Sequence, residues 1–129
     1  MYDATRSKWL SIESTALQYG RNNSSDTQTL QYGGTMVSGS SGPLMPFDGT
    51  IVAISSVGSS GDDTDVNIRA RDASNTNSIN ETFTLSSLRY TDTSANFDFN
   101  AGDYITVRAR DAATTTENLT VVLWVKWRQ

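Results

Sequence analysis

Three acidic residues, Asp62, Asp63 and Asp65, lie within four positions of one another, directly after Gly61. Closely spaced carboxylates in a loop supply the hard oxygen ligands that calcium prefers. Their spacing lacks the alternating acidic positions, the central glycine and the later glutamate of the helix-loop-helix calcium motif. Aspartate is also common in turns, because its side chain bonds to the nearby backbone. The pattern favours a solvated acidic turn, and we expect the protein to bind no metal and no cofactor.

The chain lacks two residue types that carry much of enzyme chemistry, since it contains no histidine and no cysteine. Disulfides and thiol nucleophiles are excluded, and the commonest general base at neutral pH is missing. Hydrolysis by a serine would therefore need an unusual base. The 14 Asp and Glu residues would allow a carboxylate pair for sugar cleavage, but no pair stands out by its position. We predict that the protein is not an enzyme.

Two similar segments, residues 66–73 and 105–112, place four arginines at equivalent positions, namely Arg69, Arg71, Arg108 and Arg110. If both segments are strands, their apolar residues alternate inward and the arginines point outward. Such a row could bind an anion or a protein partner, because arginine is enriched at interface centres. The alternative is a solvated sheet face on which acidic side chains of neighbouring strands balance the arginines. The sequence favours this alternative.

The elements that position these residues are predicted to be short β-strands. Hydrophobic residues make up 36% of the chain and charged residues 19%, and the polar excess is mostly Ser, Thr and Asn. This composition favours strands and polar turns over helices. We predict an all-β fold, an antiparallel two-sheet sandwich of jelly-roll type with about eight strands. An immunoglobulin topology is the competing sandwich, although its cysteine pair is absent.

Charge and hydropathy limit the partners of the chain. The formal net charge is −4, so we expect no nucleic acid partner. No apolar run approaches the roughly 20 residues that span a bilayer, so we expect no membrane partner. Residues 1–8 show no periodicity and lack the apolar segment of a signal peptide. We interpret them as an N-terminal arm before a single sandwich domain at residues 9–129, in a protein made in the cytoplasm.

The chain closes on a predicted strand, T-V-V-L-W-V-K-W-R, that is apolar on both faces. Val121 and Leu123 share one face, and Val122 and Trp124 lie on the other with Lys126. A half-exposed strand would be polar on its second face. We therefore expect one face to lie in the core and the other to contact a partner.

Four stretches of the sequence resemble a known class of proteins: D-A-T-R-S-K-W-L-S at residues 3–11, M-P-F-D-G-T-I-V at 45–52, A-G-D-Y-I at 101–105 and the closing W-V-K-W-R. Together they are similar to the small jelly-roll virion proteins of tailed bacteriophages. The A-G-D turn and the apolar last strand are also similar to tumour-necrosis-factor-like trimeric jelly rolls. The resemblance implies a homotrimer exposed on a virus particle.

Two functions are compatible with this resemblance. One is a capsid decoration (cement) protein that binds the major capsid protein and stabilises the outer capsid surface. The alternative is the receptor-binding head of a phage tail fibre, or another carbohydrate- or protein-binding β-sandwich module. The sequence contains no heptad or collagen-like segment to serve as a fibre shaft, so we expect the decoration protein.

The residues expected to make these contacts come from the two ends of the chain. A short arm that orders on docking can cover much surface, so we expect the capsid contacts to be Tyr2, Arg6, Lys8 and Trp9. The apolar outer face of the last strand is the expected subunit interface, formed by Val122, Trp124 and Lys126.

Overall fold

The computed structural model describes residues 1–24, 28–34, 40–111 and 113–129, and its regular elements are all β-strands. The all-β prediction is therefore confirmed. In chain order the strands are β1 (Tyr2–Asp3), β2 (Lys8–Trp9), β3 (Thr15–Arg21), β4 (Gln31–Tyr32), β5 (Gly49–Val57), β6 (Ser60–Gly61), β7 (Asp65–Arg71), β8 (Asn77–Thr84), β9 (Arg89–Asp92), β10 (Phe97–Phe99), β11 (Tyr104–Ala109), β12 (Thr116–Glu117) and β13 (Leu119–Trp127).

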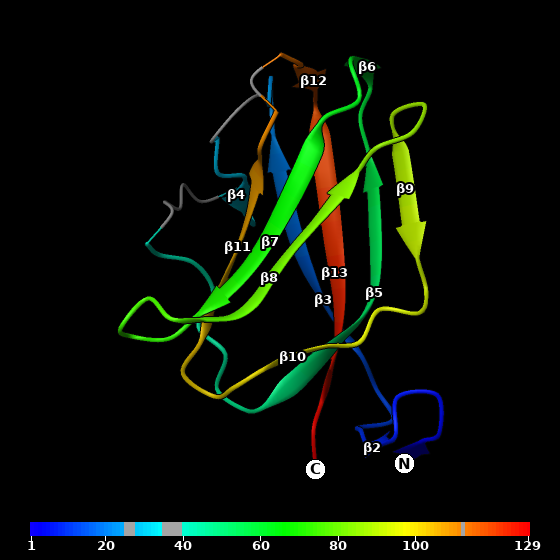
Figure 1. The fold of residues 1–129 in the computed structure, drawn as a ribbon, viewed down its shortest axis with the longest axis vertical. Helices are drawn as coiled ribbons and strands as arrows, with labels where there is room; N and C mark the ends of the chain where they lie inside the picture. The colour runs from blue at the N-terminus through cyan, green and yellow to red at the C-terminus, as the bar shows by residue number, and fades with distance from the viewer. Residues whose placement is uncertain (25–27, 35–39, 112) are drawn as a thin grey trace.

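Two antiparallel sheets form the two layers of the molecule. The large sheet has the order β10-β5-β13-β3-β4, and β9 pairs with the same edge of β5 as β10 does, further along that strand. The small sheet has the order β11-β7-β8. Figure 1 shows β7 and β8 of the small sheet crossing in front of β3, β13 and β5. Both β5 and β13 have paired strands on either side, so these two strands lie at the centre of the large sheet.

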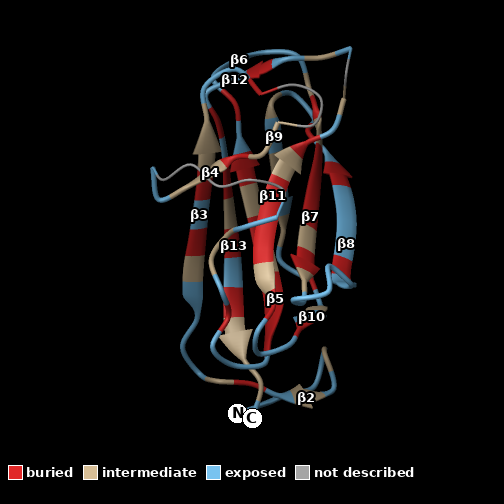
Figure 2. Ribbon diagram, turned by 90° about the vertical axis from the view of Figure 1, so that its left-hand side faces the viewer, coloured by how far each residue is buried: buried red, intermediate tan, exposed pale blue. Residues whose placement is uncertain are grey.

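Four sheets are present in the described chain, rather than the two expected. The additional sheets are the pairs β1-β2 and β12-β6. Figure 2 shows these two small pairs at opposite ends of the sandwich, with β2 close to both chain termini. The described residues form 13 strands where about eight were expected, because five of them are only two residues long. Such short pairings leave no periodicity that a sequence pattern could reveal.

Alternation along the strands builds the core. In β13 the buried residues Leu119, Val121, Leu123 and Val125 alternate with more exposed ones, as the period of a strand requires. β7 and β11 likewise turn their small and branched apolar residues inward. Burying such side chains is worth about 1.5–3 kcal/mol each relative to exposure, so this shared interior holds the two sheets together.

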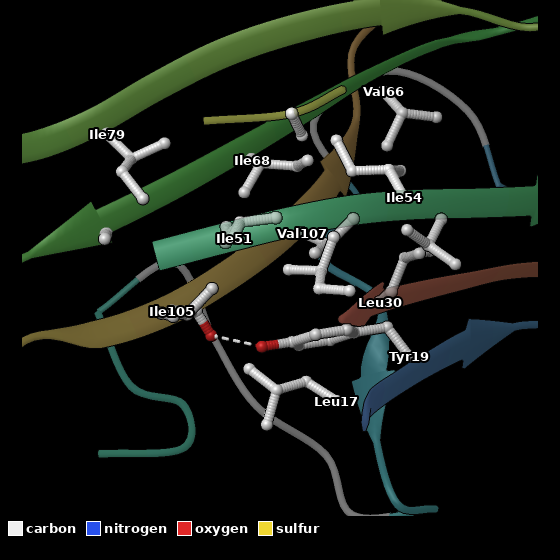
Figure 3. Close-up of a cluster of buried hydrophobic side chains, with 14 of the residues drawn as sticks. Leu17, Tyr19, Leu30, Ile51, Ile54, Val66, Ile68, Ile79, Ile105 and Val107 are labelled. Carbon is white, nitrogen blue, oxygen red and sulfur yellow. Dashed lines mark hydrogen bonds between the residues drawn. The ribbon is translucent and has the colours of Figure 1, made fainter. Parts of the chain in front are cut away.

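One buried hydrogen bond joins the two layers across the core. The hydroxyl of Tyr19, on β3 of the large sheet, donates to the backbone carbonyl of Ile105, on β11 of the small sheet, at 2.9 Å (Figure 3). Burial raises the pKa of Tyr19 well above its ordinary value, with a smaller contribution from Tyr32, so the hydroxyl stays protonated and continues to donate. The bond satisfies a polar group that would be costly to bury alone.

The N-terminal segment is not the free arm expected from the sequence. β1 and β2 form a hairpin, and the terminal ammonium of Met1 donates to the carbonyl of Leu10 at 2.8 Å. Arg6 anchors this hairpin to the body by donating to the carbonyls of Val52, at 2.8 Å, and Ala95, at 2.6 Å. The expected boundary at residue 8 therefore falls inside a folded element. Its charged residues have partners distant in the sequence, which explains why the segment shows no local pattern.

Candidate interaction surfaces

The outer face of the large sheet is centred on Trp124, whose side chain points away from the core and is 39% exposed. Its cross-strand neighbours are Ala16 on β3 and Ala53 on β5. Because both neighbours are small, they leave the sides of the indole uncovered. The alternation predicted for the last strand is confirmed here, since Val121 and Leu123 are buried on the opposite face.

The same face continues along β13 without a charged side chain. Val122 lies between Gln18 and Ser55, and Thr120 lies between Gly20 and Val57. We call these residues, with Trp124, Ala16 and Ala53, the Trp124 face. Charged residues lie at the rim of this face. Lys126 is two positions after Trp124 on β13, and Arg89 on β9 is the cross-strand neighbour of Val57. The structure thus places all three predicted interface residues on one outer face.

The Trp124 face is hollowed on both sides of the ridge formed by Thr120 and Val122. One hollow, of about 620 Å³, is lined on its far side by residues of β3 and by Gly33 and Gly34. The other, of about 310 Å³, is lined by residues of β5 and β9. The neutral ridge and the two hollows beside it give this face a shape that a second protein surface could complement.

A second apolar surface lies at the end of the sandwich that holds both chain termini (Figure 2). Tyr2 and Trp9 meet edge to face there, with ring centroids 5.4 Å apart, and they are 50% and 59% exposed. Phe47, which is 63% exposed, packs against Trp127 with centroids 6.0 Å apart. Ile12, three residues beyond Trp9, is 76% exposed.

Backbone hydrogen bonds connect the segments that carry these side chains. The amide of Gln129 donates to the carbonyl of Trp9, that of Ser11 to Trp127, and that of Arg128 to Asp48 beside Phe47. We call the surface made by Tyr2, Trp9, Ile12 and Phe47 the terminal end. Phe47 and Ile12 were not among the predicted contacts, and the only signal for Phe47 was an aromatic residue inside a segment of loop composition.

The predicted capsid contacts divide into two groups. Tyr2 and Trp9 are exposed, whereas Arg6 and Lys8 turn toward the body of the protein. Arg6 pairs with Asp3 at 2.8 Å, and Lys8 pairs with Asp98 at 2.7 Å. The structure therefore leaves Tyr2 and Trp9 exposed and pairs Arg6 and Lys8 within the fold, and contact of the four residues with a capsid stays a prediction.

Asp98 is the point at which the hairpin and the C-terminal residues meet the large sheet. Its carboxylate accepts from Lys8 and from Thr50, each at 2.7 Å, and Arg128 lies within 3.9 Å. Burial alone would raise the pKa of Asp98, but the hydrogen bonds from Lys8 and Thr50 and the nearby positive charges outweigh it, so the pKa is lowered. The carboxylate is charged at neutral pH and holds the hairpin in place.

The outer face of the small sheet carries the predicted arginine row. β7 and β11 pair directly, so Arg69 is opposite Thr106 and Arg71 is opposite Tyr104. The guanidinium of Arg71 lies 5.5 Å from the centroid of the Tyr104 ring. Burial, together with the like charges of Arg108 and of neighbouring arginines, lowers the pKa of Arg69 to about 10. The row therefore concentrates positive charge on a chain that is acidic overall.

The neighbours of this row differ from those favoured by the sequence. The residue of β8 opposite Arg69 is Asn80, and the one opposite Arg71 is Asn77, so neither is acidic. The Nε atoms of both arginines are buried and have no hydrogen-bond partner among the described residues. The expected acidic residues are therefore not the cross-strand neighbours of these two arginines on β8.

The acidic turn at residues 62–65 is used within the fold. The carboxylate of Asp63 accepts from the backbone amides of Ser87 and Leu88, at 3.1 and 2.6 Å, and both of these residues have positive φ. Asp65 accepts from the hydroxyl of Thr84 at 2.5 Å. In the described part of the chain, no group of three or more acidic residues could hold a metal ion.

Comparison with models of protein families found no match, and comparisons with curated proteins and with solved structures found none. No relative therefore assigns a role to these surfaces. The search for membrane spans found no helix in the described residues that is long and apolar enough to cross a bilayer.

Proposed function

We propose that the protein is a structural virion protein, a capsid decoration protein that assembles as a homotrimer through the Trp124 face. The observation that carries this proposal is the Trp124 face itself, which is uncharged and has a partly exposed tryptophan at its centre with alanines on both sides. Depletion of charge and enrichment of aromatic residues distinguish interface cores from ordinary surface. A second copy of the chain is the proposed occupant, and the number of three rests on the resemblance of the sequence to trimeric jelly rolls.

The energy available at Trp124 sets how large this interface must be. A tryptophan side chain that is 39% exposed has about 60–100 Å² left to bury. At about 25 cal/mol per Å², this burial contributes roughly 1.5–2.5 kcal/mol, which is less than the cost of association. The interface must therefore cover the wider Trp124 face, at about 800 Å² per subunit for an interface of standard size.

The route of the chain supports a jelly roll as the finer description of the fold. After β5 in the large sheet, the chain enters the small sheet as β7 and β8, returns as β9 and β10, crosses again as β11 and returns as β13. Isolated bridges from Thr29 and Leu44 add the preceding segment to the free edge of β11. Repeated crossing between two sheets is how jelly rolls pair strands distant in sequence.

The terminal end is the proposed capsid-binding surface. It carries Tyr2 and Trp9 from the expected set, with Ile12 and Phe47 beside them. Because the hairpin is already folded, docking would not require ordering of a free arm, and less conformational entropy would be lost on binding. The major capsid protein is the proposed partner at this surface.

The tail-fibre head remains the second candidate because both termini lie at one end of the sandwich (Figure 2). This arrangement suits a head mounted on a shaft with its opposite end facing outward. Immunogold electron microscopy of virus particles that carry the protein separates the two functions. We expect label over the heads; label at the tail tips would replace the decoration protein by the fibre head, and particles without label would overturn both.

Two exposed tryptophans provide a matched pair of variants for the capsid-binding experiment. Trp9→Asp and Trp124→Asp make the same chemical change on different surfaces. In cosedimentation with capsids, Trp9→Asp should lose binding while remaining trimeric. Retention of capsid binding by Trp9→Asp at wild-type affinity would remove the terminal end from the mechanism.

A further inference from the structure

The arginine row lies on the sheet opposite the Trp124 face, and neither proposed contact uses it. We call the outer surface made by Arg69, Arg71 and Arg108 with Asn80 and Thr82 the arginine face. A positively charged patch on an acidic protein is costly to maintain, because like charges facing one another on a sheet are destabilising. The hydrogen bonds beneath this patch determine which of its polar groups remain available to a ligand.

A buried amide, Asn67, fixes the orientation of its neighbours. The Nε of Arg108 donates to Oδ1 of Asn67 at 3.0 Å, and since a guanidinium can only donate, Oδ1 must be the atom that faces it. The Nδ2 of Asn67 then points toward β8. There it donates to Oδ1 of Asn80 at 2.9 Å and to the hydroxyl oxygen of Thr82 at 3.2 Å.

This network leaves hydrogen-bond donors on the surface. Asn80 uses its oxygen beneath the face, so its amide NH₂ remains to donate outward. Thr82 accepts from Asn67 and keeps its hydroxyl hydrogen. Beside them, the Nε atoms of Arg69 and Arg71 are buried and have no hydrogen-bond partner among the described residues. Asn80 and Thr82 therefore offer neutral donors next to two guanidinium groups, which can only donate.

We propose that the arginine face binds an acidic polysaccharide through the oxygen atoms of its sulfate or carboxylate groups. Guanidinium groups recognise such oxyanions through charge-assisted, often bidentate hydrogen bonds. The neutral donors of Asn80 and Thr82 suit the hydroxyl and ring oxygens that lie next to the acidic group of a sugar. An acidic peptide fits less well, because each backbone carbonyl is accompanied by an N–H donor, whereas ring, sulfate and carboxylate oxygens only accept.

The edges of the arginine face set the extent of the ligand. At one end Tyr104 lies beneath Arg71, and its hydroxyl donates to Oδ1 of Asn75 at 2.6 Å. At the other end Asp65 accepts from Thr84, which places a carboxylate beyond Asn67 on the same side of β7. Alternate residues of a strand are about 6.6 Å apart, so the Arg69 and Arg71 positions can contact consecutive acidic groups of a polymer.

The first test removes the charges. Dextran sulfate is titrated into the full chain by calorimetry at low ionic strength, with uncharged dextran and polyglutamate in parallel. Arg69→Gln/Arg71→Gln should weaken dextran sulfate binding by about tenfold or more, since hydrogen bonds to charged groups are lost. The matched control is Arg21→Gln/Arg89→Gln, which changes the net charge equally on strands β3 and β9 and should stay within about twofold of wild type. Equal losses in the two double variants would overturn the assignment of binding to this face.

The second test replaces one neutral donor by a charged acceptor while preserving the fold. Asn80→Asp retains an oxygen to accept from Asn67 but replaces the outward NH₂ by a carboxylate oxygen opposite Arg69. Its melting temperature should equal or exceed that of the wild type, because the new charge faces a cation, whereas dextran sulfate binding should fall by about tenfold. The control Asn22→Asp, on an exposed loop position, should leave binding unchanged.

Comparison of dextran sulfate, uncharged dextran and polyglutamate determines the chemical class of the ligand. Binding of dextran sulfate without binding of uncharged dextran supports the proposal, provided that the arginine variants lose it. Tighter binding of polyglutamate than of dextran sulfate would overturn the polysaccharide in favour of an acidic protein segment. Absence of binding to both polyanions would overturn the anion-binding face. None of these outcomes depends on the oligomeric state or on capsid docking, so the proposed function is tested separately.

Discussion

The two outer faces of this sandwich differ far more than the two inner ones. Inside, both sheets contribute branched apolar side chains that are almost fully buried. Outside, the large sheet presents Trp124 among small neutral residues, while the small sheet presents Arg69 and Arg71 opposite asparagines. A shared core therefore specifies the fold, and the outer faces are left to differ in their partners: a neutral face suits burial against protein, and a face of cationic donors suits a solvated anion.

The two sheets also differ in the neighbours of their charged residues. At the edge of the large sheet, Asp98 is paired with Lys8 and Arg128. On the small sheet, the residues of β8 directly opposite Arg69 and Arg71 are asparagines and carry amides in place of carboxylates. Paired charges hold a hairpin in place within the molecule, whereas cations without acidic cross-strand neighbours retain their capacity for an external ligand.

The largest effect should come from the inner side of the strand that carries Trp124. Leu123→Ala removes a fully buried side chain and should lower the free energy of unfolding by about 2–5 kcal/mol, because it leaves a cavity in the core. Val122→Ala, on the outer face of the same strand, should cost no more than about 1 kcal/mol in the dissociated chain. Urea unfolding of both variants at low protein concentration measures the difference. Equal losses would contradict the separation of inner and outer faces.

This separation of faces was largely predictable from the sequence. The alternation of Val121 and Leu123 with Val122 and Trp124 is a local signal, so the orientation of the last strand could be derived without a structure. The equivalent positions of Arg69 and Arg108 likewise placed them on one side of two similar strands, which proved to be neighbours.

The contacts made by charged ends of the chain could not be predicted in the same way. Arg6 bonds to carbonyls 46 and 89 positions away, and no local period encodes such a pairing. Residues 1–8 were therefore interpreted as an N-terminal arm, and the hairpin was missed. The neutral environment of Arg69 depends on the register between β7 and β8, which places Asn80 opposite it. Packing and turns set the register between strands. Composition does not contain this information, so the sequence could not show which residue lies opposite Arg69.

A smaller effect should follow from acidification. Since the pKa of Asp98 is lowered in the folded protein, its contribution to stability is fully present above the unfolded value near 3.9 and is lost as the pH falls through the folded value. Solvent screening of this half-exposed carboxylate limits the contribution to about 1 kcal/mol. Below pH 4 the wild type should lose this contribution to the free energy of unfolding, and Asp98→Asn should lack it at every pH. Parallel acid dependence of the two proteins in thermal melts would contradict the role given to Asp98.

The smallest effect concerns repulsion within the arginine face. Burial lowers the pKa of Arg69 most, and repulsion by Arg108 and Arg71 adds to it. Arg69→Gln removes this repulsion, so it should raise the free energy of unfolding by about 0.5 kcal/mol at low salt. Added sodium chloride should shrink the gain, because it screens charges. Arg89→Gln, outside the row, provides the control and should show no gain. A loss of stability in Arg69→Gln at low salt would show that this arginine is balanced within the fold.

The central claim is that the Trp124 face joins copies of the chain, and the mass of the protein in solution tests it most directly. Multi-angle light scattering should give three times the subunit mass of 14.1 kDa for the wild type. Trp124→Asp should give the subunit mass, as should Ala53→Asp on the neighbouring strand, and both should retain the wild-type circular dichroism spectrum. Trp9→Asp, at the terminal end, should remain trimeric. A monomeric wild type, or a Trp124→Asp variant that stays trimeric, would contradict the account.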